Sequence, residues 1–260
     1  MCNQQNYPFF RHILEESEVS LLDTTYDIDL TTRQVFIDRQ DLYGSIQGVN
    51  LHQFNKTALH NVWLQEIPTS VKFILTFLWG GMTVNDINVM LADPQFEQKC
   101  ESIQQTLQNL SDRTDSQSFK VAYTNQFDMI LRNPARNIPN MGTVFLSKIA
   151  FFYYWSHPNQ VNFIPMIIDR HIANALHADI ILSNNNTRYN SLGNRGVVVN
   201  SVEQHNGYIN YFYDAVESLI HNDFPNLTVP ILESRLWIRD VHYPTIDPRR
   251  EAKRIINNNR

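Results

Sequence analysis

Residues 137–155, N-I-P-N-M-G-T-V-F-L-S-K-I-A-F-F-Y-Y-W, predict a tight turn followed by a very apolar helix. Residues 164–176, I-P-M-I-I-D-R-H-I-A-N-A-L, predict a second helix that begins at Asp169. One lysine, Lys148, lies in the middle of the apolar helix. Loss of water around such an amine favours its neutral, nucleophilic form, and a carboxylate at a helix start is held by backbone amides in its ionised form. The two stretches therefore predict a lysine nucleophile and a fixed carboxylate.

The turn before this helix, I-P-N-M-G, contains two residues that tolerate a positive φ, Asn140 and Gly142. Such a turn leaves the amides of Gly142, Thr143 and Val144 at a helix N-terminus without intrahelical acceptors. Unpaired amides at the positive end of a helix suit a phosphate group. The turn and the lysine would then contact neighbouring parts of one ligand.

Each of these features also has an ordinary structural explanation. A single lysine in an apolar helix commonly extends its amine to the surface, and an aspartate before a helix commonly only caps it. The abundant aromatic residues, 15 Phe, 11 Tyr and 4 Trp, commonly fill the core. The order in which the features occur is therefore more informative than any one of them.

That order resembles the helix–hairpin–helix DNA glycosylases, and most of all the archaeal-type 8-oxoguanine DNA glycosylases and their bacterial relatives. In this family a P-G-x-G hairpin leads into a helix with a catalytic lysine, and a proline-containing segment then delivers a catalytic aspartate at a helix start. Pro139, Gly142, Lys148, Pro165 and Asp169 follow one another in that order here.

The resemblance extends over about residues 70–180, and the string G-T-V-F-L-S-K-I-A-F-F-Y-Y carries much of it. The bacterial relatives also have a Trp-Gly pair at the end of an early helix, which Trp79-Gly80 matches. Two departures stand out: Asn140 replaces the first hairpin glycine, and Lys148 lies one turn further along its helix than in most hairpin enzymes. No residue matches the base pocket of a particular glycosylase, so the resemblance indicates a reaction more than a base.

The resemblance implies a DNA glycosylase with AP lyase activity that flips a damaged or modified base, such as 8-oxoguanine, out of duplex DNA. Lys148 would attack the sugar as nucleophile, and Asp169 would act as its electrostatic and acid–base partner. The candidates for contacts to the flipped base are aromatic: Phe152, Trp79, Trp155 and Trp237. The candidates for contacts to the DNA backbone are Asn140, Gly142, Thr143, Arg132 and Arg136, with Arg188 and Arg195 further along the chain.

Two alternatives stay open. The excised base could be a hypermodified base of phage DNA, which would make the protein a defence enzyme. The chain could also be a non-catalytic helical module that binds DNA or a protein partner through the same turn.

Composition sets further limits. A net charge of −5 argues against a chain that coats DNA without specificity, although a local basic surface is compatible with it. Two cysteines are too few for a four-cysteine iron–sulfur cluster, and the spacing of His157, His171 and His177 fits no common metal site. We expect no metal, no cofactor, no signal peptide and no membrane span, and hence a cytoplasmic monomer.

The apolar periodicity and the turn residues predict a mostly α fold, a helix–hairpin–helix glycosylase-like bundle with little β structure in the N-terminal part. We expect residues 1–260 to form a single globular unit, with two helical lobes as the alternative: 55–135 with the terminal helices, and 136–180. The only predicted strand is at 32–37. The expected helices lie at about residues 9–22, 55–66, 69–78, 83–93, 95–110, 119–131, 142–155, 169–177, 201–220 and 228–237.

Overall fold

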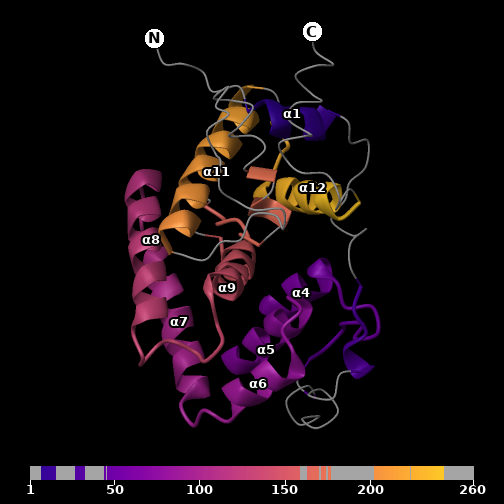
Figure 1. The fold of residues 1–260 in the computed structure, drawn as a ribbon, viewed down its shortest axis with the longest axis vertical. Coiled ribbons are helices and arrows are strands. Elements are labelled where there is room, and N and C mark those ends of the chain that lie inside the picture. Colours follow the sequence, from indigo (N-terminus) through magenta and orange to yellow (C-terminus); the bar gives the residue numbers. More distant parts are fainter. Residues whose placement is uncertain are drawn as a thin grey trace, which may run out of the picture. The chain divides into compact units, whose positions relative to one another are not determined.

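A computed structural model of the chain describes residues 7–15, 27–32, 44, 46–158, 163–169, 171–173, 175–176, 202–222 and 224–242. These residues are mostly helical, and their only β pairing is an isolated bridge between Ile28 and Phe54 (Figure 1). The prediction of a mostly α fold is therefore confirmed. Of the predicted strand, only Thr32 is described, and it ends the 3-10 helix η1 (Leu30–Thr32).

The chain forms two compact units. The terminal unit combines Met1–Leu22 with Met166–Arg260, and the central unit is Asp23–Pro165. The helices of the terminal unit are α1 (Pro8–Glu15), α11 (Val202–Asn222) and α12 (Val229–His242), with further helical residues at 171–173 and 175–176. Those of the central unit are α4 (Lys56–Trp63), α5 (Thr69–Trp79), α6 (Val84–Leu91), α7 (Phe96–Leu110), α8 (Ser116–Arg132) and α9 (Thr143–Ser156).

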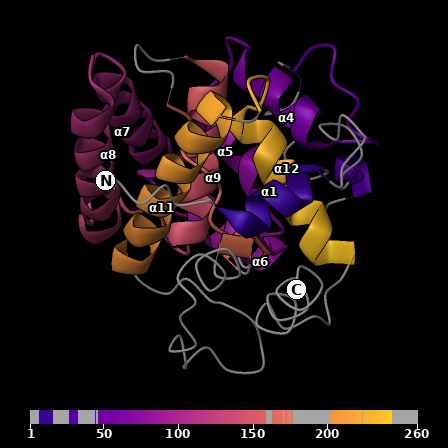
Figure 2. The same cartoon turned by 90° about the horizontal axis from the view of Figure 1, so that it is seen from above.

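Two apolar helices, α5 and α9, form the core of the central unit. Helix α9 packs against α4, α5 and α7, and α5 packs against α4, α7 and α9, while α7 and α8 lie side by side (Figures 1 and 2). Every residue from 70 to 78 in α5 and from 146 to 154 in α9 is buried. A helix that is covered on several sides needs apolar residues all round, which explains both sequences. No helix in the described part of the chain is long and apolar enough to cross a membrane.

In the terminal unit, helices from early and late in the sequence pack together. Helix α1 packs against α12, and Arg235 donates a hydrogen bond of 3.3 Å to the Leu14 carbonyl. Phe10 contacts Phe212 of α11 edge to face, with ring centroids 6.1 Å apart. This core therefore joins residues from both ends of the chain.

Most helix ends follow from the local signals in the sequence. Thr83 caps α6 as predicted, since its hydroxyl accepts a hydrogen bond from the Asp86 amide. Helix α8 begins at Ser116, three residues before the predicted start, because the Asp115 carboxylate accepts hydrogen bonds from the amides of residues 117 and 118. The predicted helix at 9–22 is described only as far as Glu15.

Candidate functional site

Lys148 lies on α9 in the core of the central unit, where its side chain is only 6% exposed. Its Nζ donates a hydrogen bond of 3.3 Å to the carbonyl of Gly80, at the end of α5. The predicted setting of this lysine, in the middle of an apolar and buried helix, is confirmed. The lysine does not reach the surface in the way that an ordinary surface lysine would.

Two aromatic rings lie beside the Lys148 amine. The Nζ lies 5.5 Å from the ring centre of Trp79 and 5.6 Å from that of Phe145, within the range of cation–π attraction. Phe152, one turn after Lys148, meets Trp79 edge to face with centroids 5.3 Å apart. The structure thus brings together three of the predicted site residues, Lys148, Trp79 and Phe152. We name these three, with Gly80 and Phe145, the Lys148 cluster.

The exposure of the rings in this cluster differs. Phe152 is fully buried, whereas Trp79 and Phe145 are half-buried. The indole N–H of Trp79 is shielded from solvent and meets no acceptor among the described residues. Trp79 therefore has an unused hydrogen-bond donor near the Lys148 amine.

Helix α5 ends in a tight glycine turn. The amide of Gly81 donates to the Leu78 carbonyl and that of Met82 to the Phe77 carbonyl, which is the Schellman arrangement. Gly81 takes the left-handed conformation, with φ +83°, and Gly80 keeps a helical φ of −70°. The predicted end of this helix at Gly80-Gly81 is confirmed. The sequence did not reveal that the Gly80 carbonyl meets Lys148; the only local signal was the Trp79-Gly80 pair.

In the turn before α9, the positive φ that the sequence predicted is found at Asn140 but not at Gly142. Asn140 has φ +60°, and the Met141 amide donates to the Ile138 carbonyl at 3.1 Å, as in a type II turn with Pro139 at its second position. Gly142 has a negative φ of −82° and is the N-cap of α9. The turn therefore needs one left-handed residue, and asparagine supplies it.

The Asn140 side chain anchors this turn to α6. Its Nδ2 donates a hydrogen bond of 3.1 Å to the carboxylate of Asp86, which also accepts a hydrogen bond from the Thr83 hydroxyl. Gly142 is exposed and gives α9 no side-chain cap, and Thr143 is half-buried. The start of α9 is thus held in place from α6, with an acidic side chain beside the turn.

Trp155, at the end of α9, is covered on one face. His60 of α4 stacks on it, with centroids 4.1 Å apart and planes 17° apart. Burial lowers the pKa of His60 below its ordinary value. Phe152 and the Lys56 amine also lie against the Trp155 ring, so Trp155 has neighbours besides His60.

Asp169 lies in the terminal unit and begins a helix, as predicted. Its carboxylate accepts hydrogen bonds from the amides of His171 at 2.9 Å and Ile172 at 3.0 Å, and its carbonyl accepts one from Ala173. The side chain is half-buried. Lys148 and Asp169 therefore belong to different units, and their approach to one another stays a prediction.

The remaining predicted contacts are dispersed. Arg132 is exposed and forms an ion pair with Asp128 one turn earlier, and Arg136 is half-buried in the segment before the turn. Trp237 belongs to α12, but its side chain lies outside the described part of the chain. Residues 177, 188 and 195 lie entirely outside it. Their predicted roles are untested.

A second buried lysine, Lys72 of α5, has a setting close to that of Lys148. It is also 6% exposed, its Nζ donates to the Trp63 carbonyl at 3.0 Å, and it lies 5.7 Å from the Trp63 ring centre. Burial lowers the pKa of Lys72, and the Glu66 carboxylate partly offsets this effect. Burial beside a tryptophan therefore does not by itself distinguish Lys148.

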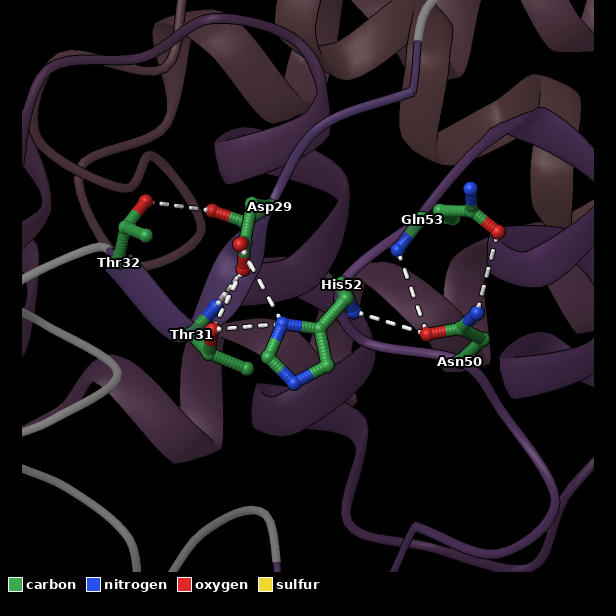
Figure 3. Close-up of polar contacts among 6 residues, drawn as sticks. All are labelled: Asp29, Thr31, Thr32, Asn50, His52 and Gln53. Carbon is green, nitrogen blue, oxygen red and sulfur yellow. Dashed lines mark hydrogen bonds and ion pairs between the residues drawn. The ribbon is translucent and has the colours of Figure 1, made fainter.

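A polar cluster near residue 30 contains the residue types of a hydrolytic triad, but not its geometry (Figure 3). The Thr31 hydroxyl donates to the Asp29 carboxylate, and the same His52 nitrogen, Nδ1, faces both Asp29 at 3.3 Å and Thr31 at 3.2 Å. His52 is 70% exposed, and the Thr31 hydrogen bond is the main cause that lowers the pKa of Asp29. The cluster holds 27–32 against 50–54 beside the Ile28–Phe54 bridge, which is a structural role.

Comparisons with family models, curated proteins and solved structures give no match to this chain. The resemblance to helix–hairpin–helix glycosylases therefore rests on the residues themselves. Chemically, the Lys148 cluster offers one buried amine, one unused indole donor and a turn of defined backbone at the start of the same helix. That combination is the basis of the proposal that follows.

Proposed function

We propose that this protein is a DNA glycosylase with AP lyase activity, in which Lys148 is the nucleophile and Asp169 its electrostatic partner. The observation that carries the proposal is the setting of the Lys148 amine, which is buried beside Trp79 and Phe145 on the helix that follows the Asn140 turn. An amine nucleophile must be kept from water and held in one place, and both conditions are met here.

In the proposed reaction, the neutral Lys148 amine attacks C1′ of the sugar, and the base leaves with the electron pair of the glycosidic bond and takes up a proton. The sugar ring then opens to a Schiff base between Lys148 and C1′. Loss of a C2′ proton expels the 3′ phosphate by β-elimination, which cleaves the strand. The Asp169 carboxylate would stabilise the positive charge that develops on the sugar.

Before it attacks, the Lys148 amine must be neutral. The Gly80 carbonyl lies at the negative end of α5, where a helix favours a cation. In the proposed mechanism the amine rests there and gives up its proton when DNA is bound, with Asp169 as the acceptor. The aspartate is suited to this role because backbone amides hold its carboxylate.

Trp79 is the strongest candidate for a contact to the flipped base. It is half-buried, it touches the lysine, and its N–H can still donate one hydrogen bond. Phe152 would support Trp79 from behind through its edge-to-face contact. The Asn140 turn would contact the DNA backbone through the amides that begin α9.

The test is borohydride trapping on duplexes that carry 8-oxoguanine, an abasic site or a hypermodified cytosine. We expect the wild-type protein to form a covalent adduct with at least the abasic duplex, and Lys148→Gln to form none. Lys72→Gln is the matched control, because it removes an equally buried lysine from a neighbouring helix. The proposal fails if the wild-type protein forms no adduct, or if Lys148→Gln still forms one.

Asp169 can be tested without damage to its helix. Asn caps helices about as well as Asp, so Asp169→Asn removes the charge and keeps the cap. We expect adduct formation to slow by roughly 100-fold or more, in the range of a lost electrostatic contact in a transition state, while the unfolding midpoint stays unchanged. An adduct rate equal to that of the wild type would reduce Asp169 to a helix cap.

A non-catalytic helical module is the second candidate, and the likeness between Lys148 and Lys72 favours it. Both amines donate to a carbonyl and lie against a tryptophan, as a structural lysine would. Such a module would bind DNA or a protein through the Asn140 turn. It predicts that Lys148→Gln leaves DNA binding and biological effect unchanged.

A further inference from the structure

We propose that Gly80 is a positioning residue for Lys148, and that the absence of a side chain at position 80 sets where the amine lies. The inference rests on the proposed function and extends it to a residue of another helix. Gly80 contributes in two ways: its carbonyl accepts the hydrogen bond from Nζ, and its bare Cα leaves room for the lysine stem.

The room at Gly80 is taken by the lysine and its aromatic neighbour. A Cβ placed on Gly80 would lie 3.1 Å from Cδ of Lys148 and 3.0 Å from Cε1 of Phe145. It would also lie 3.0 Å from the Thr76 carbonyl oxygen, one turn earlier in the same helix. A methyl group at position 80 therefore requires the lysine stem, the Phe145 ring and the Thr76 carbonyl to give way by a few tenths of an ångström, and we infer that the Nζ moves with its stem.

The φ and ψ of Gly80 do not themselves require glycine. Gly80 has φ −70° and ψ −2°, which any residue adopts. Gly81, the next residue, is the opposite case: its φ of +83° requires glycine, but a Cβ there would meet nothing within 4 Å. Position 80 is thus restricted by close contacts with Lys148, Phe145 and the Thr76 carbonyl, and position 81 by backbone conformation alone.

This contrast supplies a matched pair of variants. Gly80→Ala changes the space beside Lys148 and keeps an allowed backbone. Gly81→Ala strains the same turn and leaves the space beside Lys148 unchanged. If any disturbance of the end of α5 impairs the protein, both variants will be impaired. If the position of the lysine is what matters, only Gly80→Ala will be impaired.

The first measurement does not depend on DNA. The folded proteins are treated with formaldehyde and a mild reductant, and methylation of Lys148 is compared with that of Lys72 by mass spectrometry. We expect Gly80→Ala to raise the rate at Lys148 several-fold relative to Lys72, because the amine leaves the Gly80 carbonyl, and Gly81→Ala to leave the ratio unchanged. An unchanged ratio in Gly80→Ala overturns the inference.

The second measurement is single-turnover adduct formation on a saturating duplex with an abasic site, together with the DNA dissociation constant. We expect Gly80→Ala to slow the adduct step up to about 10-fold, because the shift of the amine is smaller than the roughly 1 Å that costs about 100-fold, with the dissociation constant within about two-fold. Gly81→Ala should keep the wild-type rate. A wild-type rate in Gly80→Ala overturns the inference and spares the proposed function, whereas a wild-type protein without any adduct overturns the proposed function itself.

Discussion

Lys148 and Lys72 occupy closely similar environments on the two core helices of the central unit. Each is 6% exposed, each donates to a backbone carbonyl, and each lies 5.5–5.7 Å from the centre of a tryptophan ring. The two lysines differ in how deeply their hydrogen bonds are buried. The hydrogen bond of Lys72 is fully buried, and that of Lys148 is only partly buried.

The partners also differ in kind. The carbonyl that receives Lys148 belongs to a glycine that leaves room for the stem, and the nearby Trp79 has an unused N–H. Lys148 also follows a turn of fixed backbone that begins its helix. Burial alone keeps a lysine away from water. A lysine nucleophile also needs space around its side chain and an amine that the substrate can reach.

The largest expected effect concerns two fully buried rings, one on each of the helices that carry the two lysines. Phe152 and Phe73 are both fully buried, so Phe152→Ala and Phe73→Ala should each lower the free energy of unfolding by about 3–5 kcal/mol, as for other large core residues. Urea titration measures this loss. Phe152→Leu is the control, because it keeps most of the volume and should cost less than about 1.5 kcal/mol. A cost below about 1 kcal/mol for Phe152→Ala would mean that this ring is not part of the core.

A smaller effect concerns the charge on Lys72. Burial lowers its pKa in the folded state, so just below the ordinary value of about 10.4 the unfolded chain binds more protons, and stability rises with pH. Lys72→Met removes this dependence. The wild-type protein should therefore gain stability relative to Lys72→Met as the pH rises from 7 to 10.

Urea titrations of both proteins across this range provide the measurement. Lys148→Met, titrated in parallel, shows whether the two amines differ in the folded state. A constant difference between wild type and Lys72→Met at every pH would contradict the prediction.

The smallest effect concerns His60 of α4, which stacks on Trp155 at the end of α9. Its pKa is lowered by burial, so the unfolded chain takes up a proton first as the pH falls, and stability declines below about pH 6.5. His60→Phe keeps a ring on Trp155 and removes the titration, so it should reduce the loss of stability between pH 7.5 and 5.5. His157, whose pKa is also lowered, should account for part of what remains. An equal loss in both proteins would show that His60 titrates as if exposed.

Much of the helical structure could be predicted from local signals. Apolar runs identified α5 and α9, Thr83 identified the start of α6, and Gly80-Gly81 identified the end of α5. Each of these signals acts over a few residues, and so it can be read along the chain. Where a cap was overlooked, at Asp115, the predicted start of the helix was three residues late.

The surroundings of Lys148 could be predicted only in part. Its position in a buried helix was visible from the sequence, but its hydrogen bond to Gly80 spans 68 residues and has no local pattern. The same holds for the bond between Asn140 and Asp86, 54 residues apart, and for the stacking of His60 on Trp155. Lys72 lies in an equally apolar run, V-K-F-I-L, yet only the structure shows how closely it resembles Lys148.

The packing of α1 against α12 has a consequence for synthesis of the chain. Val229, where α12 begins, follows Pro8 of α1 by 221 residues. At roughly 5–20 residues per second, a ribosome needs roughly 10–45 s to cover that distance. The central unit is complete within this interval and can fold as an insert, while α1 lacks its packing against α12. We therefore expect chaperones to bind α1 in nascent chains that are stalled before residue 229, and to bind it less in longer ones.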